Sequence, residues 1–86
     1  IWWSVYTPGE AAGDFAKTQL EQIDIARRLI AKYPDTFTLA STAADIRAAK
    51  AAGKIGGMLG AEGGHAIEDS LALLRMYYAL GVRYMT

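Results

Sequence analysis

KIGGMLGAEGGH, residues 54–65, is the stretch around which this chain is organised. Its short apolar run ends abruptly at Glu62, which is followed by two glycines and by His65, the only histidine of the sequence. In parallel α/β folds, side chains at the carboxyl ends of strands face the ligand-binding crevice. Gly63 and Gly64 permit a sharp turn and close approach by a metal or a substrate. The pattern therefore predicts a functional Glu62, and a metal-bridging carboxylate is the leading hypothesis.

Strand and helix patterns alternate along the rest of the chain. Runs rich in aromatic, β-branched or small apolar residues predict strands over residues 1–7, 36–40, 55–61 and 82–86. Helical spacing and capping residues predict helices over residues 14–33, 42–52 and 70–80. The order βαβαβαβ predicts right-handed crossovers and an α/β fold with a parallel sheet and outer helices. Because a small open sheet would leave its edges uncovered, a segment of a (β/α)8 TIM-type barrel explains the pattern better than a complete domain.

Apolar spacing, capping residues or both support each of the three expected helices. The first has apolar residues at helical spacing at Ala16, Leu20, Ile23, Ala26, Ile30 and Tyr33, with an Asp24–Arg28 pair on its polar face. The second begins at Ser41 or Thr42, with Asp45 as a capping-box partner and Gly53 just beyond its end. The third is capped by Asp69 or Ser70 and has a wide apolar arc at Leu71, Leu74, Tyr77, Tyr78 and Leu80.

Length and composition limit the possible functions. The 86 residues form at most one small domain, and the start at Ile1 and the end at Thr86 inside an expected strand predict an internal segment of a longer protein. Nine basic and nine acidic residues give zero net charge, which argues against nucleic acid as a partner. The sequence has no cysteine, no long apolar run and no signal-peptide pattern, so any metal here needs oxygen or imidazole ligands and the localisation stays undetermined.

Six blocks in the same order carry a resemblance to a known family. They are WSVYTP (3–8), LEQID (20–24), YPDTF (33–37), ADIR (44–47), GAEGGH (60–65) and LGVRYMT (80–86). The chain resembles, over essentially its whole length, the renal (membrane) dipeptidase family of zinc metallopeptidases. Pro8 is followed by Gly9 instead of the cysteine found in mammalian relatives, so their disulfide at this place is impossible here.

The resemblance implies a (β/α)8-barrel hydrolase of the amidohydrolase type that cleaves dipeptides with a metal-bound hydroxide. It implies two zinc ions bridged by Glu62, a place near the substrate pocket for Tyr6, and a possible homodimer of the parent protein. A shared carboxylate would offset the repulsion between two divalent ions about 3.5–4 Å apart. The other family ligands, a His-x-Asp pair and later histidines, lie outside residues 1–86, so we expect the isolated chain to be inactive and to bind zinc weakly or not at all.

Simpler roles compete for several of these residues. His65 is better explained as structural support of the turn, together with Gly63 and Gly64, than as a metal ligand. Tyr6 fits pocket lining and structural packing equally well, and Arg83 suggests an ordinary salt bridge. Packing in the core or at an interface accounts for Trp2, Trp3, Tyr77 and Tyr78.

Two other functions remain open for the whole chain. One is a phosphate-binding βα unit, which the glycines suggest; its loop spacing does not match the known motifs, and Glu62 would repel phosphate. The other is a non-catalytic α/β scaffold or assembly segment whose apolar faces are covered by a partner.

Overall fold

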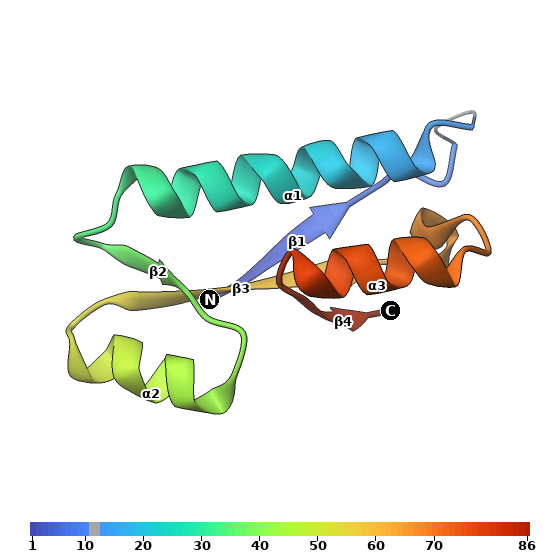
Figure 1. The fold of residues 1–86 in the computed structure, drawn as a ribbon. Coiled ribbons are helices and arrows are strands. Elements are labelled where there is room, and N and C mark those ends of the chain that lie inside the picture. The colour runs from blue at the N-terminus through green and yellow to red at the C-terminus, as the bar shows by residue number, and fades with distance from the viewer. Residues whose placement is uncertain (11–12) are drawn as a thin grey trace.

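Four parallel strands and three α-helices alternate along the chain in a computed structural model that describes residues 1–10 and 13–86 (Figure 1). The strands are β1 (Trp2–Tyr6), β2 (Phe37–Leu39), β3 (Ile55–Glu62) and β4 (Val82–Met85). The helices are α1 (Phe15–Lys32), α2 (Ala43–Ala51) and α3 (Leu71–Ala79), and a short 3-10 helix, η1 (Gly64–Ile67), follows β3. The predicted α/β class with parallel strands is confirmed, whereas η1 was not predicted because its glycines suggested only a turn.

The strand β3 is the centre of the sheet. The backbone groups of successive residues in a strand point alternately to the strands on its two sides. On one side of β3, the Met58 N–H donates to the Ile1 carbonyl. On the other side, the Gly57 and Ala61 carbonyls accept from the Ala40 and Thr86 N–H groups. Thus β1 lies along one side of β3, and β2 and β4 lie along the other side, beside its first and second halves. Consecutive strands β1 and β2 are therefore not paired, because β3 lies between them.

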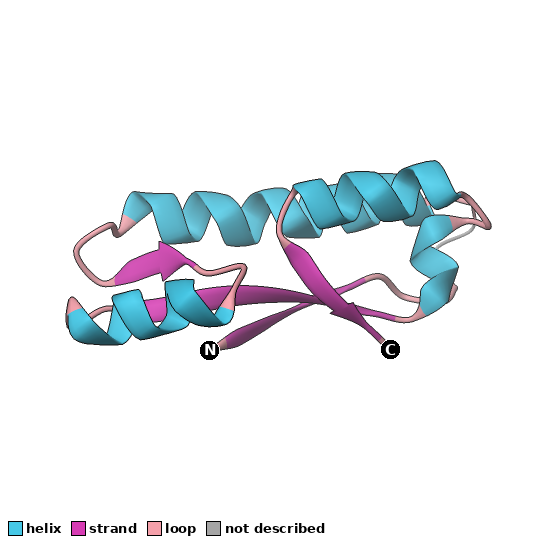
Figure 2. Ribbon diagram, turned by 60° about the horizontal axis from the view of Figure 1, so that its bottom comes forward, coloured by secondary structure: helices cyan, strands magenta, loops and turns pink. Residues whose placement is uncertain are grey.

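Two helices cover one face of this sheet. Side chains from β1, β3 and β4 pack against α1 and α3 in a core that contains Val5, Ile23, Ala26, Leu59, Ala61, Ala66, Tyr77 and Val82. Figure 2 shows α1 and α3 together on the same side of the strands. The helix α2 instead packs near Gly56, whose missing side chain leaves room for the methyl groups of Ala40 and Ala49. The opposite face of β1, with the exposed Trp2, Ser4 and Tyr6, has no such cover in the described part of the chain.

The buried side of α1 differs from the predicted one at Gln19, Leu20 and Tyr33. Ile23, Ala26 and Ile30 are buried as expected, but the fourth buried residue is Gln19, while Leu20 and Tyr33 are 39% and 47% exposed. The spacing 19, 23, 26, 30 follows a single helical stripe, and Gln19 can occupy it because its amide is hydrogen-bonded there. The prediction for Leu20 was wrong because it treated every polar residue as solvent-facing.

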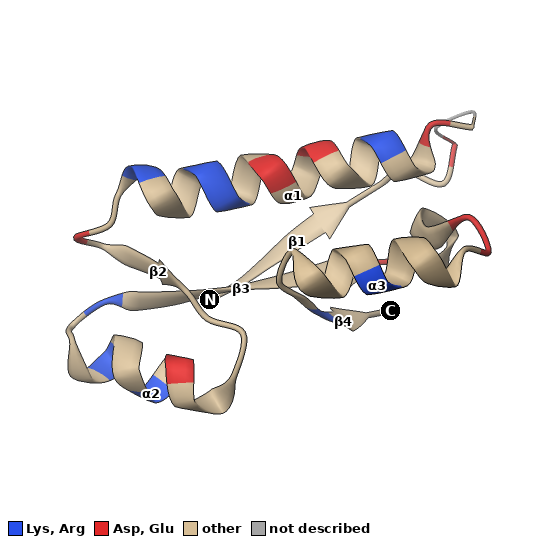
Figure 3. Ribbon diagram, viewed as in Figure 1, with Lys and Arg blue, Asp and Glu red and all other residues tan. Residues whose placement is uncertain are grey.

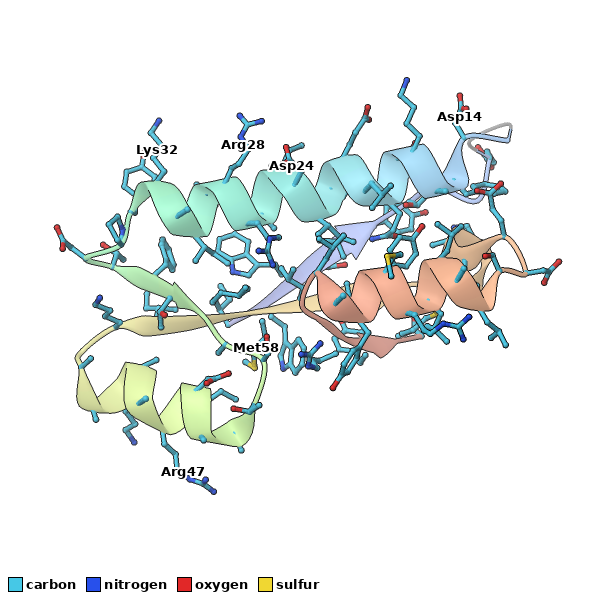
Figure 4. The ribbon with its side chains drawn as sticks, in the orientation of Figure 1. Asp14, Asp24, Arg28, Lys32, Arg47 and Met58 are labelled. Atoms are coloured by element: carbon cyan, nitrogen blue, oxygen red, sulfur yellow. The ribbon has the colours of Figure 1, made fainter. Side chains whose placement is uncertain are left out.

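The apolar arc of α3 is mostly exposed within the described residues. Only Tyr77 of the predicted set is fully buried, at 0% exposure, whereas Leu71 and Tyr78 are 63% and 62% exposed. Arg83 forms no salt bridge with the described residues; it donates to backbone carbonyls, and its guanidinium lies 3.9 Å from the Tyr78 ring centre. The predicted Asp24–Arg28 pair is present at 3.2 Å on the exposed face of α1 (Figure 4). No described helix is long and apolar enough to cross a membrane.

The predicted capping box at the start of α2 is formed. The Asp45 N–H donates to Thr42 Oγ1 at 3.1 Å, and the Asp45 carboxylate accepts from the backbone N–H groups of Ser41 and Thr42 at 2.9 and 3.0 Å. These hydrogen bonds, that from Ser41 first, hold the pKa of Asp45 below its usual value. At the next helix Ser70, not Asp69, is the cap, because its hydroxyl accepts from the Leu73 N–H.

Replacing Thr42 with alanine is expected to lower the free energy of unfolding by about 1 kcal/mol, since it removes the cap acceptor. Thr36→Ala is a matched control, because the Thr36 hydroxyl makes no hydrogen bond within the described residues. The lowered pKa of Asp45 means that its contribution is present above pH 3.8 and is lost as the pH falls below it. Denaturant titrations at neutral and acidic pH measure both effects. Equal losses for the two variants would contradict the capping role.

Candidate functional site at the carboxyl edge of the sheet

Glu62 is the last residue of β3, and it lies beside the end of β1. Tyr6 and Glu62 are register partners in the parallel ladder, so both side chains point to the face of the sheet away from α1 and α3. Glu62 is half-buried and Tyr6 is 51% exposed. The Ser4 hydroxyl, on the same face and two residues before Tyr6 in β1, donates to Glu62 Oε1 at 2.7 Å. The structure thus places Ser4, Tyr6 and Glu62 next to one another.

Aromatic side chains of β1 and β4 occupy the same face of the sheet, next to Ser4, Tyr6 and Glu62. The Trp2 and Tyr84 rings meet edge to face, with centres 5.0 Å apart. Tyr84 lies across Gly60, where an added Cβ would come within 2.7 Å of three atoms of its ring and hydroxyl. Gly60 is the register partner of Ser4, so the missing side chain leaves space for the Tyr84 ring next to the Ser4–Glu62 pair. On this face, the aromatic rings of Trp2 and Tyr84 therefore lie next to the polar Ser4–Glu62 pair.

Thr7, immediately after β1, is held from two directions. Its hydroxyl donates to Gln19 Oε1 at 3.0 Å, and Gln19 Nε2 donates to the Val5 carbonyl at 3.0 Å; Thr7 and Gln19 are both 0% exposed. His65 Nε2 donates to the Thr7 carbonyl at 2.6 Å. Such buried, fully partnered polar groups fix the backbone that carries them. The end of β1, and with it Tyr6, is thus tied both to α1 and to the turn after β3.

The turn after Glu62 has a backbone that requires glycine at one position. Gly63 has φ of +93°, and a Cβ there would lie 2.4 Å from Cε1 and Nδ1 of His65. The missing side chain therefore admits the His65 ring, which also meets Phe15 edge to face at 5.3 Å. Gly64 is exposed, and the Gly63 N–H donates to Thr86 Oγ1 at 3.0 Å. Because its Nε2 is engaged with Thr7, His65 links two loops in this arrangement.

Glu62 has the chemistry and the position of one carboxylate ligand in a metal site. Glu62 offers oxygen donors, which suit zinc and other divalent ions, and Glu62 Oε2 accepts no hydrogen bond from the described residues. Within residues 1–10 and 13–86, no three His, Cys, Asp or Glu side chains gather closely enough to hold a metal ion. The further ligands would have to come from residues outside this chain.

Most other charged side chains lie on the helices and not at the Glu62 end of the sheet. Both Lys or Arg and Asp or Glu occur along α1 and along α2, as Figure 3 shows. Asp24, Arg28 and Lys32 point away from the sheet in Figure 4. One carboxylate has a structural partner instead: Glu68 accepts from the Ala16 N–H at 3.0 Å, at the start of α1, where negative charge is favourable.

Sequence reasoning missed three residues of this site. Ser4 could have been found from the alternation of β1, which puts it on the same face as Tyr6, but its contact with Glu62 required the register of β1 against β3. Gln19 could have been found as a polar residue on an apolar helical stripe. Nothing in the local sequence signals Thr7, because its partners lie 12 and 58 residues away.

Comparisons with known proteins agree on one family. The family model of membrane dipeptidases, peptidase family M19, matches residues 1–86. The chain is 40% identical to dipeptidase ataJ of Aspergillus terreus and to dipeptidase 3 of Rattus norvegicus, in each case over 98% of its length. It superposes on the crystal structure of an amidohydrolase from Pseudomonas aeruginosa with a TM-score of 0.85 and 27% identity, covering 98% of this chain.

These matches cover only part of each relative. The chain spans 23% and 17% of the two dipeptidases and 24% of the amidohydrolase chain. The structural match nevertheless covers 98% of this chain, and the family match includes Ser4, Tyr6 and the segment 62–65. The chain belongs to the membrane dipeptidase family, peptidase family M19.

Proposed function

We propose that this chain is part of a zinc-dependent dipeptidase, in which Glu62 is a carboxylate that bridges two zinc ions and Tyr6 lines the substrate pocket. The observation that carries the proposal is the position of Glu62, at the carboxyl end of the central strand, half-buried, with one oxygen free of hydrogen bonds from the described residues. M19 dipeptidases are metallopeptidases, and the chain matches their family model along its whole length. The remaining strands of a barrel would come from the rest of the full-length protein.

Each residue of the edge has a part in this proposal. Glu62 supplies negative charge where two cations would repel each other, and Tyr6 places a ring and a hydroxyl beside that carboxylate. Gly63 and His65 hold the turn and the end of β1 in register. Bound zinc would supply Lewis acidity and an activated water for attack on a peptide carbonyl. The substrate class is a dipeptide, as the names of the relatives suggest.

The rival functions fit this edge less well. A phosphate-binding loop would meet the Glu62 carboxylate, whose charge repels the ligand. A non-catalytic scaffold needs neither a free carboxylate oxygen at the strand end nor the aligned Tyr6, although the exposed apolar residues of α3 leave room for a partner. Activity of the full-length protein separates these possibilities.

The full-length protein is expected to hydrolyse dipeptides, to lose that activity on dialysis against a strong chelator, and to regain it with added zinc. The isolated 86-residue chain is expected to be inactive and to bind zinc weakly or not at all. A catalytic zinc ion usually has about three protein ligands, and no three His, Cys, Asp or Glu side chains gather in the part of the chain that the structure describes. Product formation and zinc content, measured on both proteins, check this. Zinc-free hydrolysis by the full-length protein would exclude the metal role, and absence of hydrolysis would favour the scaffold.

A further inference from the structure

The Ser4 hydroxyl has a defined partner on the open face of the sheet. It donates to Glu62 Oε1 at 2.7 Å, although Ser4 is paired in the ladder with Gly60 and not with Glu62. Tyr84 occupies the space over Gly60, and the Ser4 hydroxyl reaches diagonally from β1 to the carboxylate two residues farther along β3. A charge-assisted O–H···O⁻ bond of this length is among the stronger ones in proteins.

The part of β1 directly after Ser4, and the residue that follows the strand, are held in place. Val5 is buried in the core and its carbonyl accepts from Gln19, and Thr7 is held by Gln19 and His65. Ser4 therefore presents its oxygen from a backbone that these contacts hold in place. Serine has a single hydroxyl hydrogen, so it engages one carboxylate oxygen and leaves Oε2 free of partners from the described residues.

We propose that Ser4 is a positioning residue that orients the Glu62 carboxylate for metal binding, an inference that rests on the proposed role of Glu62. An unrestrained glutamate loses side-chain freedom when it binds a metal, and a hydrogen bond made beforehand reduces that loss. Groups that hydrogen-bond a metal ligand orient it, and their removal typically weakens metal affinity by about 10- to 100-fold. Ser4 acts through Glu62 and does not itself need to touch the metal or the substrate.

The test uses the full-length protein, stripped of metal, and measures zinc affinity by competition with a chelator of known affinity. The central pair is Ser4→Thr and Ser4→Val, because the two side chains have nearly the same shape, both suit a strand, and only threonine retains the hydroxyl. Ser4→Ala is the plain deletion. Ser41→Ala is the matched control, since the Ser41 hydroxyl makes no hydrogen bond within the described residues. Glu62→Ala reports on the metal site itself.

We expect zinc affinity about 10- to 100-fold weaker for Ser4→Val and Ser4→Ala, and close to the unchanged protein for Ser4→Thr and Ser41→Ala. Wild-type affinity in Ser4→Val, together with loss of zinc in Glu62→Ala, would overturn the role of Ser4 and leave the proposed function standing. Unchanged zinc affinity in Glu62→Ala would remove the metal role of Glu62 and the inference with it. If Ser4→Ala fails to fold, the Thr and Val pair still decides the outcome.

Discussion

Replacing Glu62 with glutamine in the full-length protein is expected to reduce dipeptide hydrolysis by roughly 10²–10³-fold or more, the size of effect seen when an electrostatic contact to the reaction centre is removed. The glutamine amide has nearly the same shape and its oxygen can still accept from Ser4, but it lacks the charge that two divalent ions require. Zinc content should fall in parallel. Steady-state hydrolysis and metal analysis of the same preparations measure both quantities.

The matched control for this change is Glu21→Gln on the exposed side of α1, which removes the same charge far from the carboxyl edge of the sheet. Its activity and zinc content are expected to equal those of the unchanged protein. Full activity in Glu62→Gln would show that Glu62 is an ordinary strand-end carboxylate. Loss of activity with unchanged zinc content would assign Glu62 to the substrate instead of the metal.

Replacing Tyr77 with alanine is expected to lower the free energy of unfolding by about 3–5 kcal/mol. Tyr77 is the largest fully buried side chain of the core, and its hydroxyl donates to the Ala66 carbonyl at 2.7 Å, which ties α3 to η1 directly after the candidate site. Tyr77→Phe keeps the ring and loses the hydrogen bond, so a smaller loss of about 1–2 kcal/mol is expected. Denaturant unfolding of the full-length protein measures both values.

Tyr78 provides the matched control for Tyr77→Phe. It is the adjacent residue, 62% exposed, and Tyr78→Phe is expected to change stability by less than about 0.5 kcal/mol. Equal effects of the two Phe variants would contradict the buried hydrogen bond.

The Tyr77 prediction also has a pH dependence. Burial, followed by the nearby Glu68 charge, raises the pKa of Tyr77 above 10.0, so the folded state keeps the phenol proton longer than the unfolded state does. Its contribution to stability is therefore present below pH 10 and is lost as the pH rises through the folded pKa. Tyr77→Phe lacks this alkaline loss. A stability difference between the two proteins that does not shrink above pH 10 would argue against it.

Local sequence patterns predicted much of the fold. Aromatic and β-branched runs bounded by Pro8–Gly9 and Pro34 located β1 and β2, and the Thr42–Asp45 pair located the start of α2, because capping and turn chemistry depend on residues close in sequence. The class of parallel α/β fold followed from the alternation alone. Which helix residues are buried was harder to predict, because apolar spacing alone does not determine which residues of a helix the sheet covers. Leu20 and Gln19 show this most clearly.

The site divides in the same way. Glu62, Gly63, Gly64 and His65 are adjacent in the chain, and their pattern at the end of an apolar run is sufficient to single them out. The contacts of Ser4 with Glu62 and of His65 with Thr7 join residues 58 positions apart, and no local pattern contains them. They depend on the register of β1 against β3.

By itself, the sequence determined the order of strands and helices, the family, and the carboxylate at the end of the central strand, because these follow from local propensity, spacing and motif. Only the tertiary structure decided that β3 lies between β1 and β2, that Gln19 is buried, and that the Gly63 position admits the His65 ring. Parallel pairing and side-chain packing join segments that are distant in the chain, and their geometry is set by the whole fold.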